Sequence, residues 1–188
     1  IDNKLEARSY QTVGSFGYYD GFNSVEGQVG RLQYYAMHQF RRGDGWRENA
    51  GFQQNTAIAS VGYQLTDKLQ LKADLTYMKY LAQQPGGLQD FEFEQDPRSS
   101  KRDRNWFQVD WRLAALSADY IASASLKFNT RIFALQAERM ALGELGPIHR
   151  PDPMRDRTLI SGNYDNWGIE SRMMKRYKIN KSFNHLLL

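Results

Sequence analysis

The amino-acid sequence predicts an all-β fold in which antiparallel strands form an up-and-down transmembrane β-barrel. Three observations support this prediction. Apolar and polar residues alternate along about nine segments, as expected for strands with two different faces. Several segments run for about 11–15 residues, whereas soluble strands usually have roughly 5–6 and membrane-spanning strands roughly 9–11. Short and long connections also follow one another alternately, and no helix is predicted.

The clearest alternation lies in residues 68–81, which read KLQLKADLTYMKYL. The apolar or small residues at every second position are Leu69, Leu71, Ala73, Leu75 and Tyr77. Polar residues lie between them, including Lys72 and Asp74. We predict that the apolar stripe of this strand, and of each other strand, contacts lipid and that the charged stripes face water inside a closed barrel.

The remaining strands are predicted from the same alternation. In chain order they are residues 4–14, 21–29, 31–40, 56–65, 106–115, 126–132, 166–177 and 182–188. The first two alternate more weakly, and the last is truncated. In the fifth of these segments, the apolar positions are Phe107, Val109, Trp111 and Leu113. The polar positions of that segment include Asp110 and Arg112.

The connections between the predicted strands alternate in length. The short ones lie at Gly30, 66–68, 119–125 and 180–182. The long ones are residues 41–55, 83–104 and 142–163. Alternation of this kind puts the tight turns at one rim and the long loops at the other, as in outer-membrane barrels. A sandwich with Greek-key connections has no reason to alternate in this way.

The composition of the 188 residues argues against several other classes of protein. No segment is apolar enough for a membrane-spanning helix, and the lack of cysteine excludes disulfides and thiolate metal sites. The net charge of +4 does not demand a nucleic-acid partner, and the basic residues 99–104 lack interleaved aromatic residues. The three histidines are not spaced as metal ligands, and no catalytic set is present. We therefore predict no enzyme activity, no cofactor and no nucleic-acid partner.

Two other kinds of barrel remain open at this point. A soluble ligand-binding β-barrel also alternates, but its interior is apolar and its exterior is polar. The transmembrane barrel therefore predicts that Leu71 points outward and Lys72 points into the barrel, and the soluble barrel predicts the opposite. A structural or adhesive outer-membrane barrel without transport activity is the other alternative.

Several stretches, in order, resemble one family of membrane proteins. They are GDGWREN at 43–49, YQLTDKLQL at 63–71, PGGL at 85–88, WRLAALSADYIASASLKFN at 111–129 and NYDNWGIESRMMKRY at 163–177. Their order and spacing resemble the TonB-dependent outer-membrane transporters, and in particular the ferric citrate transporter subgroup. The resemblance covers nearly the whole chain.

This resemblance implies a barrel of about 22 strands whose lumen holds an N-terminal plug. Residues 1–188 would then be a partial barrel, about its first 8–9 strands, without the plug. The implied function is uptake of a ferric chelate, either ferric citrate or another siderophore, across the bacterial outer membrane. The implied partners are the ferric chelate, the lipid bilayer, and TonB through the missing plug.

The resemblance also suggests ligand-binding residues. Ferric chelates of this kind are anionic, and arginine side chains can bind their oxygens bidentately. Arg139 aligns with an arginine that binds ferric citrate in the resembling subgroup, whereas the second such arginine would fall near Gly162 and is missing. The further candidates are Arg155, Arg157, His149 and Arg47. For Arg47, packing within its own loop is the simpler alternative.

Overall fold

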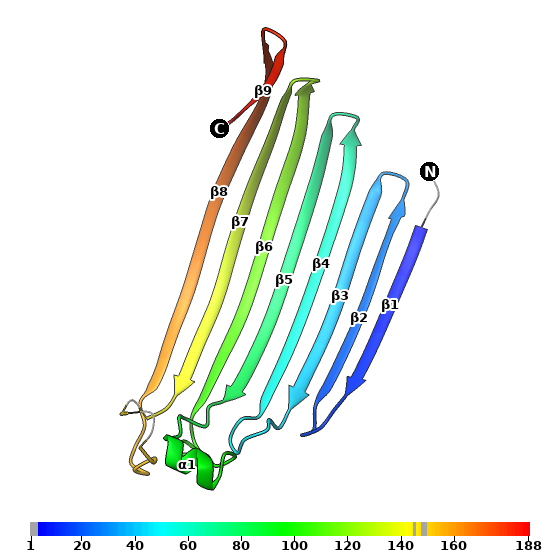
Figure 1. The fold of residues 1–188 in the computed structure, drawn as a ribbon. Coiled ribbons are helices and arrows are strands. Elements are labelled where there is room, and N and C mark those ends of the chain that lie inside the picture. Colours follow the sequence, from blue (N-terminus) through cyan, green and yellow to red (C-terminus); the bar gives the residue numbers. More distant parts are fainter. Residues whose placement is uncertain (1–3, 145, 148–149) are drawn as a thin grey trace.

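The computed structural model describes residues 4–144, 146–147 and 150–188. Within these ranges, nine strands form one antiparallel sheet in which each strand pairs with its neighbours in the chain (Figure 1). The strands are β1 (Lys4–Val13), β2 (Tyr19–Val29), β3 (Leu32–Gly43), β4 (Phe52–Thr66), β5 (Leu69–Gln83), β6 (Trp106–Ser123), β7 (Leu126–Leu142), β8 (Leu159–Ile179) and β9 (Ser182–Leu187). The edge strands β1 and β9 do not pair with each other, so the sheet is open. This topology confirms the predicted all-β, antiparallel, up-and-down fold.

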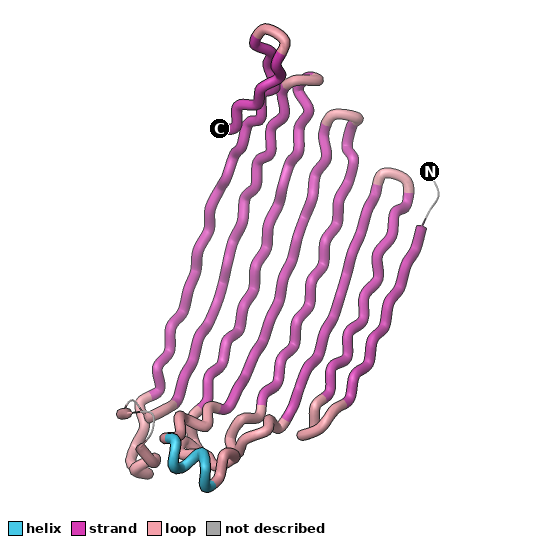
Figure 2. The backbone as a smooth tube through the Cα atoms, in the orientation of Figure 1, coloured by secondary structure: helices cyan, strands magenta, loops and turns pink. Residues whose placement is uncertain are grey.

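The longer strands exceed what a soluble domain needs (Figure 2). β4 and β5 have 15 residues each, β7 has 17, β6 has 18 and β8 has 21. The predictions for β6 and β7 were too short, since each found only one half of its strand. The missed parts are residues 116–123 and 133–142, in which alanines (Ala118, Ala122, Ala134, Ala137 and Ala141) weaken the contrast between the two faces.

The connections are arranged as predicted, with tight turns at one end of the sheet and longer loops at the other (Figure 1). The tight turns are residues 30–31, 67–68, 124–125 and 180–181. The loops at the opposite end are residues 14–18, 44–51, 84–105 and 143–158. Gly30 has φ 58° and Asn180 has φ 53°, the left-handed conformation that two-residue hairpin turns require.

A short helix, α1 (Asp90–Gln95), lies in the loop of residues 84–105 and was not predicted. The Glu92 carboxylate accepts a 2.8 Å hydrogen bond from the backbone N–H of Gln89, which closes a capping box at the helix start. A helix of fewer than two turns gives too little periodicity to detect in a sequence. Within the described ranges, no helix is long and apolar enough to cross a membrane.

Direct pairs across the sheet divide its side chains between two faces, because paired residues of antiparallel strands point to the same side. Lys72 pairs with Ser117, which in turn pairs with Arg131, and we call their side the inner face. Leu71 and Ala118 lie together on the opposite side, which we call the outer face.

Alanines give a like-for-like comparison of the two faces. Ala114 and Ala134 on the outer face are exposed, whereas Ala115 and Ala137 on the inner face are only 4% and 8% exposed. The inner side chains are therefore crowded together, which is the condition expected on the concave side of a curved sheet. These two alanines are also the only buried apolar residues in the described part of the chain.

Large apolar side chains gather on the outer face in the half of the sheet nearer the tight turns. They are Val61, Tyr63, Leu71, Leu75, Leu116, Tyr120, Ile132, Trp167 and Ile169, and all of them are exposed. On β5, the outer positions from Leu69 to Tyr77 carry no charge, a span close to the roughly 9–11 residues that a membrane-spanning strand needs. An apolar surface this extended requires a partner or a lipid environment.

Nearer the loops, the outer face becomes polar and the inner face becomes apolar. The outer face there carries Lys79, Asp110, Arg112, Glu138 and Asp165. The register of β5 and β6 pairs Leu113 with Thr76 and Trp111 with Met78, which puts these side chains on the inner face with Lys72.

The prediction that Phe107, Val109, Trp111 and Leu113 share the lipid-facing stripe was therefore wrong. The alternation of β6 continues without interruption, but the apolar parity changes between Leu113 and Leu116. Ala114 and Ala115 lie between them, and two neighbouring alanines hide this change in the sequence.

Candidate functional site

The candidate site lies on the inner face near the loops, around the exposed guanidinium of Arg139. Arg139 is close to the end of β7 and pairs directly with Val109 on β6 and Gly162 on β8. Residues diagonal to a direct pair have Cα atoms about 7–8 Å away, within reach of aromatic side chains. Three such diagonal positions around Arg139 hold Phe107, Trp111 and Tyr164.

Two of these aromatic residues have defined contacts. The guanidinium carbon of Arg139 lies 5.1 Å from the centroid of the Phe107 ring, a cation–π arrangement. Tyr164 folds back over Gly162, because a Cβ atom added at Gly162 would lie 3.0 Å from the Tyr164 hydroxyl. Position 162 thus has no side chain of its own, and a phenol occupies the space beside Arg139.

The aromatic residues around Arg139 belong to a larger apolar surface. We call it the inner belt, and it comprises Met37, Ile58, Met78, Tyr80, Phe107, Val109, Trp111, Leu113, Phe133 and Leu135. All of these side chains are partly exposed. The inner belt begins directly below the loops and ends about halfway along the strands.

Below the inner belt, toward the tight turns, the inner face is polar. Lys72 and Asp74 form an ion pair at 2.8 Å, and Asn129 donates a 2.8 Å hydrogen bond to Asp119. A cavity of about 440 Å³ opens here beside Gly62, because glycine has no side chain to fill the space. From β4 to β8, the inner face therefore has a charged zone near the tight turns and an apolar zone near the loops. On β2 and β3, the charged residues Asp20 and Arg41 lie on the inner face near the loops.

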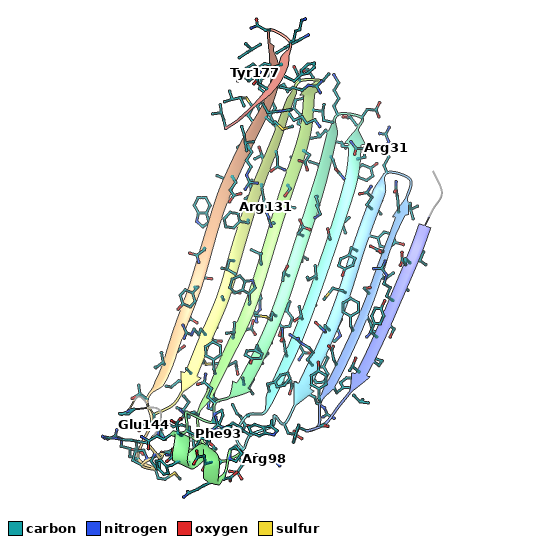
Figure 3. All side chains as sticks on the ribbon, in the orientation of Figure 1. Arg31, Phe93, Arg98, Arg131, Glu144 and Tyr177 are labelled. Carbon is teal, nitrogen blue, oxygen red and sulfur yellow. The ribbon has the colours of Figure 1, made fainter. Side chains whose placement is uncertain are left out.

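The loops at the rim are braced against one another by arginine side chains, and Figure 3 shows Phe93, Arg98 and Glu144 in this region. Arg47 donates hydrogen bonds to the carbonyl oxygens of Gly86 at 2.9 Å and Ser99 at 2.8 Å. Arg98 donates in the opposite direction, to the Trp46 carbonyl at 3.0 Å. These contacts fix the loop of residues 44–51 against the loop of residues 84–105.

The loop of residues 84–105 and the loop of residues 143–158 are joined in the same way. Arg102 is 1% exposed and donates a 2.5 Å hydrogen bond to the Pro147 carbonyl. Arg104 holds the Asp152 carboxylate with two hydrogen bonds of 3.0 and 2.9 Å. The Asn49 amide donates to the Arg102 carbonyl, so all three loops meet at this point.

The predicted ligand-binding residues Arg155 and Arg157 take part in this bracing. Both donate to Glu144, at 3.1 and 3.3 Å, and Arg157 also contacts the Asp152 carboxylate. The Arg155 side chain is 70% exposed, whereas that of Arg157 is 5% exposed. Arg155 therefore faces solvent, while the charge of Arg157 is already matched by two carboxylates.

These contacts shift the pKa values of both carboxylates. The hydrogen bond from Arg155, followed by the one from the Gly146 backbone, lowers the pKa of Glu144 below its ordinary value. The hydrogen bond from Arg104, with a further one from Arg157, lowers the pKa of Asp152 well below its usual range. Both groups are held in the ionised form at neutral pH.

The structure brings some of the predicted residues together and separates others. Arg155 and Arg157 share Glu144, whereas Arg47 lies in another loop and His149 lies outside the described residues. Arg139 lies on β7 and not in these loops, and its guanidinium contacts the Phe107 ring. Their roles in ligand binding stay predictions, and the contacts of Arg47 and Arg157 give each a bracing role.

The aromatic neighbours of Arg139 were not predicted from the sequence. Phe107 and Trp111 were assigned to the opposite face, and Tyr164 was named only within the resembling stretch 163–177, just before the predicted strand 166–177. The register of β6 against β7 would have revealed them, because it sets Val109 opposite Arg139. Among the described residues, no cluster of histidine, aspartate or glutamate could hold a metal ion.

These features define a class of structure: consecutive strands of an up-and-down barrel with an apolar outer band and a loop-covered rim. The sequence matches no family model and no curated protein. Among solved structures, the ferric citrate transporter FecA in its unliganded form is similar, with a TM-score of 0.82 and 23% identity. The similarity covers 99% of this chain and 28% of that one, and at this identity it shows the fold.

Proposed function

We propose that this chain is part of an outer-membrane receptor that takes up a ferric chelate with energy from TonB. The observation that carries the proposal is the combination of an uncharged outer band with an exposed arginine on the inner face just below the loops. The fold shared with the ferric citrate transporter FecA supports the same function. The predicted outer-membrane location, the ferric chelate and the TonB partner all belong to this proposal.

In this proposal, the ligand enters at the loop rim and reaches Arg139. The guanidinium presents several N–H donors in one plane and binds carboxylate or phenolate oxygens in pairs. Arg155 is the second exposed candidate, because its contact with Glu144 leaves most of its side chain in solvent. The iron is cargo and reaches the protein with its chelator, so the protein needs no metal ligands of its own.

The arrangement of the two faces argues against a soluble ligand-binding barrel. Such a barrel would bury its apolar face and expose its polar face. Here Leu116 is 64% exposed and Trp167 is 82% exposed on the outer face. The charged pair Lys72–Asp74 lies on the crowded inner face instead.

Uptake of radioactive iron by intact cells tests the proposal. Cells that make the protein should accumulate chelated ⁵⁵Fe, and accumulation should stop when TonB is deleted. Arg139→Gln should reduce uptake, whereas Arg42→Gln, on the outer face, should not. Uptake that is indifferent to TonB would contradict the transporter function, and a chain that binds cells or surfaces without uptake would favour an adhesive barrel.

A further inference from the structure

The surroundings of Arg139 are unusually poor in charge for an anion-binding site. The inner-face positions that flank it on β7 and on the two neighbouring strands are Phe107, Val109, Trp111, Ala137, Ala141, Ile160, Gly162 and Tyr164. All of them are described, and none carries a charge. Arg139 is thus a single cation within an aromatic and aliphatic surface.

We propose that this site binds an anionic ferric chelate that carries an aromatic ring, such as a catecholate, in preference to an aliphatic hydroxycarboxylate such as citrate. The inference rests on the proposed function and names its substrate class. Arg139 supplies the positive charge, and Trp111 and Tyr164 supply the surface on which the ring of the ligand packs.

The physical reason is the mismatch between citrate and an aromatic surface. The face of an aromatic ring carries partial negative charge, so it attracts cations and the edges of other rings and does not favour carboxylates. Moving a carboxylate away from water is costly unless it is paired with a cation or hydrogen-bonded. Ferric citrate presents several carboxylates, and one guanidinium cannot match them all.

An aromatic chelate fits the same surface better. Its oxygens can accept hydrogen bonds from guanidinium N–H groups of Arg139, whose side chain is exposed beside the Phe107 ring. Its ring can then pack against Trp111 or Tyr164 in an offset or edge-to-face arrangement. Burial of the ring supplies the free energy that a second cation would otherwise have to supply.

No second cation lies at the flanking inner-face positions of β6, β7 and β8, all of which the structure describes. Gly162 is the direct partner of Arg139, and the Tyr164 hydroxyl fills the space that a side chain there would need. The phenol adds a neutral hydrogen-bonding group and an aromatic face at that point. At position 162, opposite Arg139, the site therefore has an aromatic surface from Tyr164 and no second charge.

Equilibrium dialysis with ⁵⁵Fe on the intact, detergent-purified protein tests this inference. The two probes are the ferric complex of 2,3-dihydroxybenzoate and ferric citrate. We expect the aromatic complex to bind at least about tenfold more tightly, since ring packing and ring burial both contribute. Arg139→Gln should weaken the aromatic complex by about tenfold or more, because it removes a charged hydrogen bond.

Two variants of Trp111 separate ring packing from folding. Trp111→Leu should weaken the aromatic complex by about two- to tenfold and leave ferric citrate within about twofold of the wild type. Trp111→Phe keeps a ring and should retain most of the affinity for the aromatic complex. Resistance of the barrel to unfolding in cold detergent confirms that each variant is folded.

The outcomes are distinct. Ferric citrate binding as tightly as the aromatic complex, or equal losses for both probes in Trp111→Leu, overturns the inference and leaves the proposed function intact. Binding of neither probe by the folded protein overturns the proposed function and this inference together.

Discussion

Arg104 and Asp152, which lie 48 residues apart in the sequence, are joined by a pair of hydrogen bonds. These bonds connect the loop of residues 84–105 to the loop of residues 143–158. Arg157 contacts Oδ2 of the same carboxylate. The rim of the sheet is therefore a connected platform of three loops, in which arginine side chains replace the regular backbone pairing of the strands.

Removing the Asp152 charge should loosen this platform. In Asp152→Asn, Arg104 and Arg157 lose their shared carboxylate, and a charge-assisted hydrogen bond contributes enough that local opening should rise by roughly tenfold or more. Hydrogen exchange measured by mass spectrometry should show the increase in residues 84–105 and 143–158. Asp103→Asn, at an exposed neighbouring position, is the control, and equal effects of the two variants would contradict the assignment.

The same contacts predict a dependence of loop stability on pH. Because the folded-state pKa values of Glu144 and Asp152 are lowered, both carboxylates stabilise the loops fully above their ordinary pKa values of 4.5 and 3.8. This stabilisation should disappear as the pH falls below those values and each carboxylate takes up a proton. Exchange rates of the loops, corrected for the intrinsic effect of pH, should be flat from about pH 8 to about pH 5 and then rise. A rise between neutral pH and about pH 5 would point to other groups.

The orientation of the sheet in the membrane can be tested at adjacent residues. Leu71→Lys puts a charge on the outer band, between its centre and its edge near the tight turn, and should cost about 1–3 kcal/mol. Gln70→Lys puts the same charge on the inner face, next to Lys72, and should cost much less. Refolding into lipid vesicles, followed by electrophoretic mobility without heating, measures both. Equal impairment of the two variants would show that the faces are misassigned.

A change of ligand preference is expected from a second arginine beside Arg139. Gly162→Arg alone should disturb the site, because the new side chain meets the Tyr164 hydroxyl at 3.0 Å. The double variant Gly162→Arg/Tyr164→Ala removes that obstacle and supplies a second cation. Its affinity for ferric citrate should rise relative to the wild type, and its affinity for an aromatic complex should fall. Tyr164→Ala alone is the control for the lost ring.

Much of the fold could be predicted from the sequence because strand alternation is a local signal. The stripe from Leu69 to Tyr77 on β5 and the alternation of short and long connections both hold in the structure. The prediction failed on β6, where two adjacent alanines conceal the point at which the apolar side changes from inner to outer. Alternation shows that a segment is a strand with two different sides. Only its register with neighbouring strands shows which face of the sheet each side belongs to.

The candidate site was harder to predict, because it depends on residues from three strands. Arg139 was identified through a resemblance, but its neighbours Phe107 and Tyr164 meet it only after β6, β7 and β8 are aligned. The arginine platform was missed for a similar reason, since Arg104 and Asp152 lie in different loops and show no shared motif. Interactions of high sequence separation leave no local trace.

The platform has a consequence for the kinetics of ligand capture. Loops that are already joined through Arg47, Arg102 and Arg104 do not have to become ordered when a ligand arrives, so binding pays little conformational entropy at that step. Association rates should then be similar for related ligands and set mainly by diffusion of the ligand to the loop rim. Differences in affinity among those ligands should appear as differences in residence time, which stopped-flow measurements can resolve.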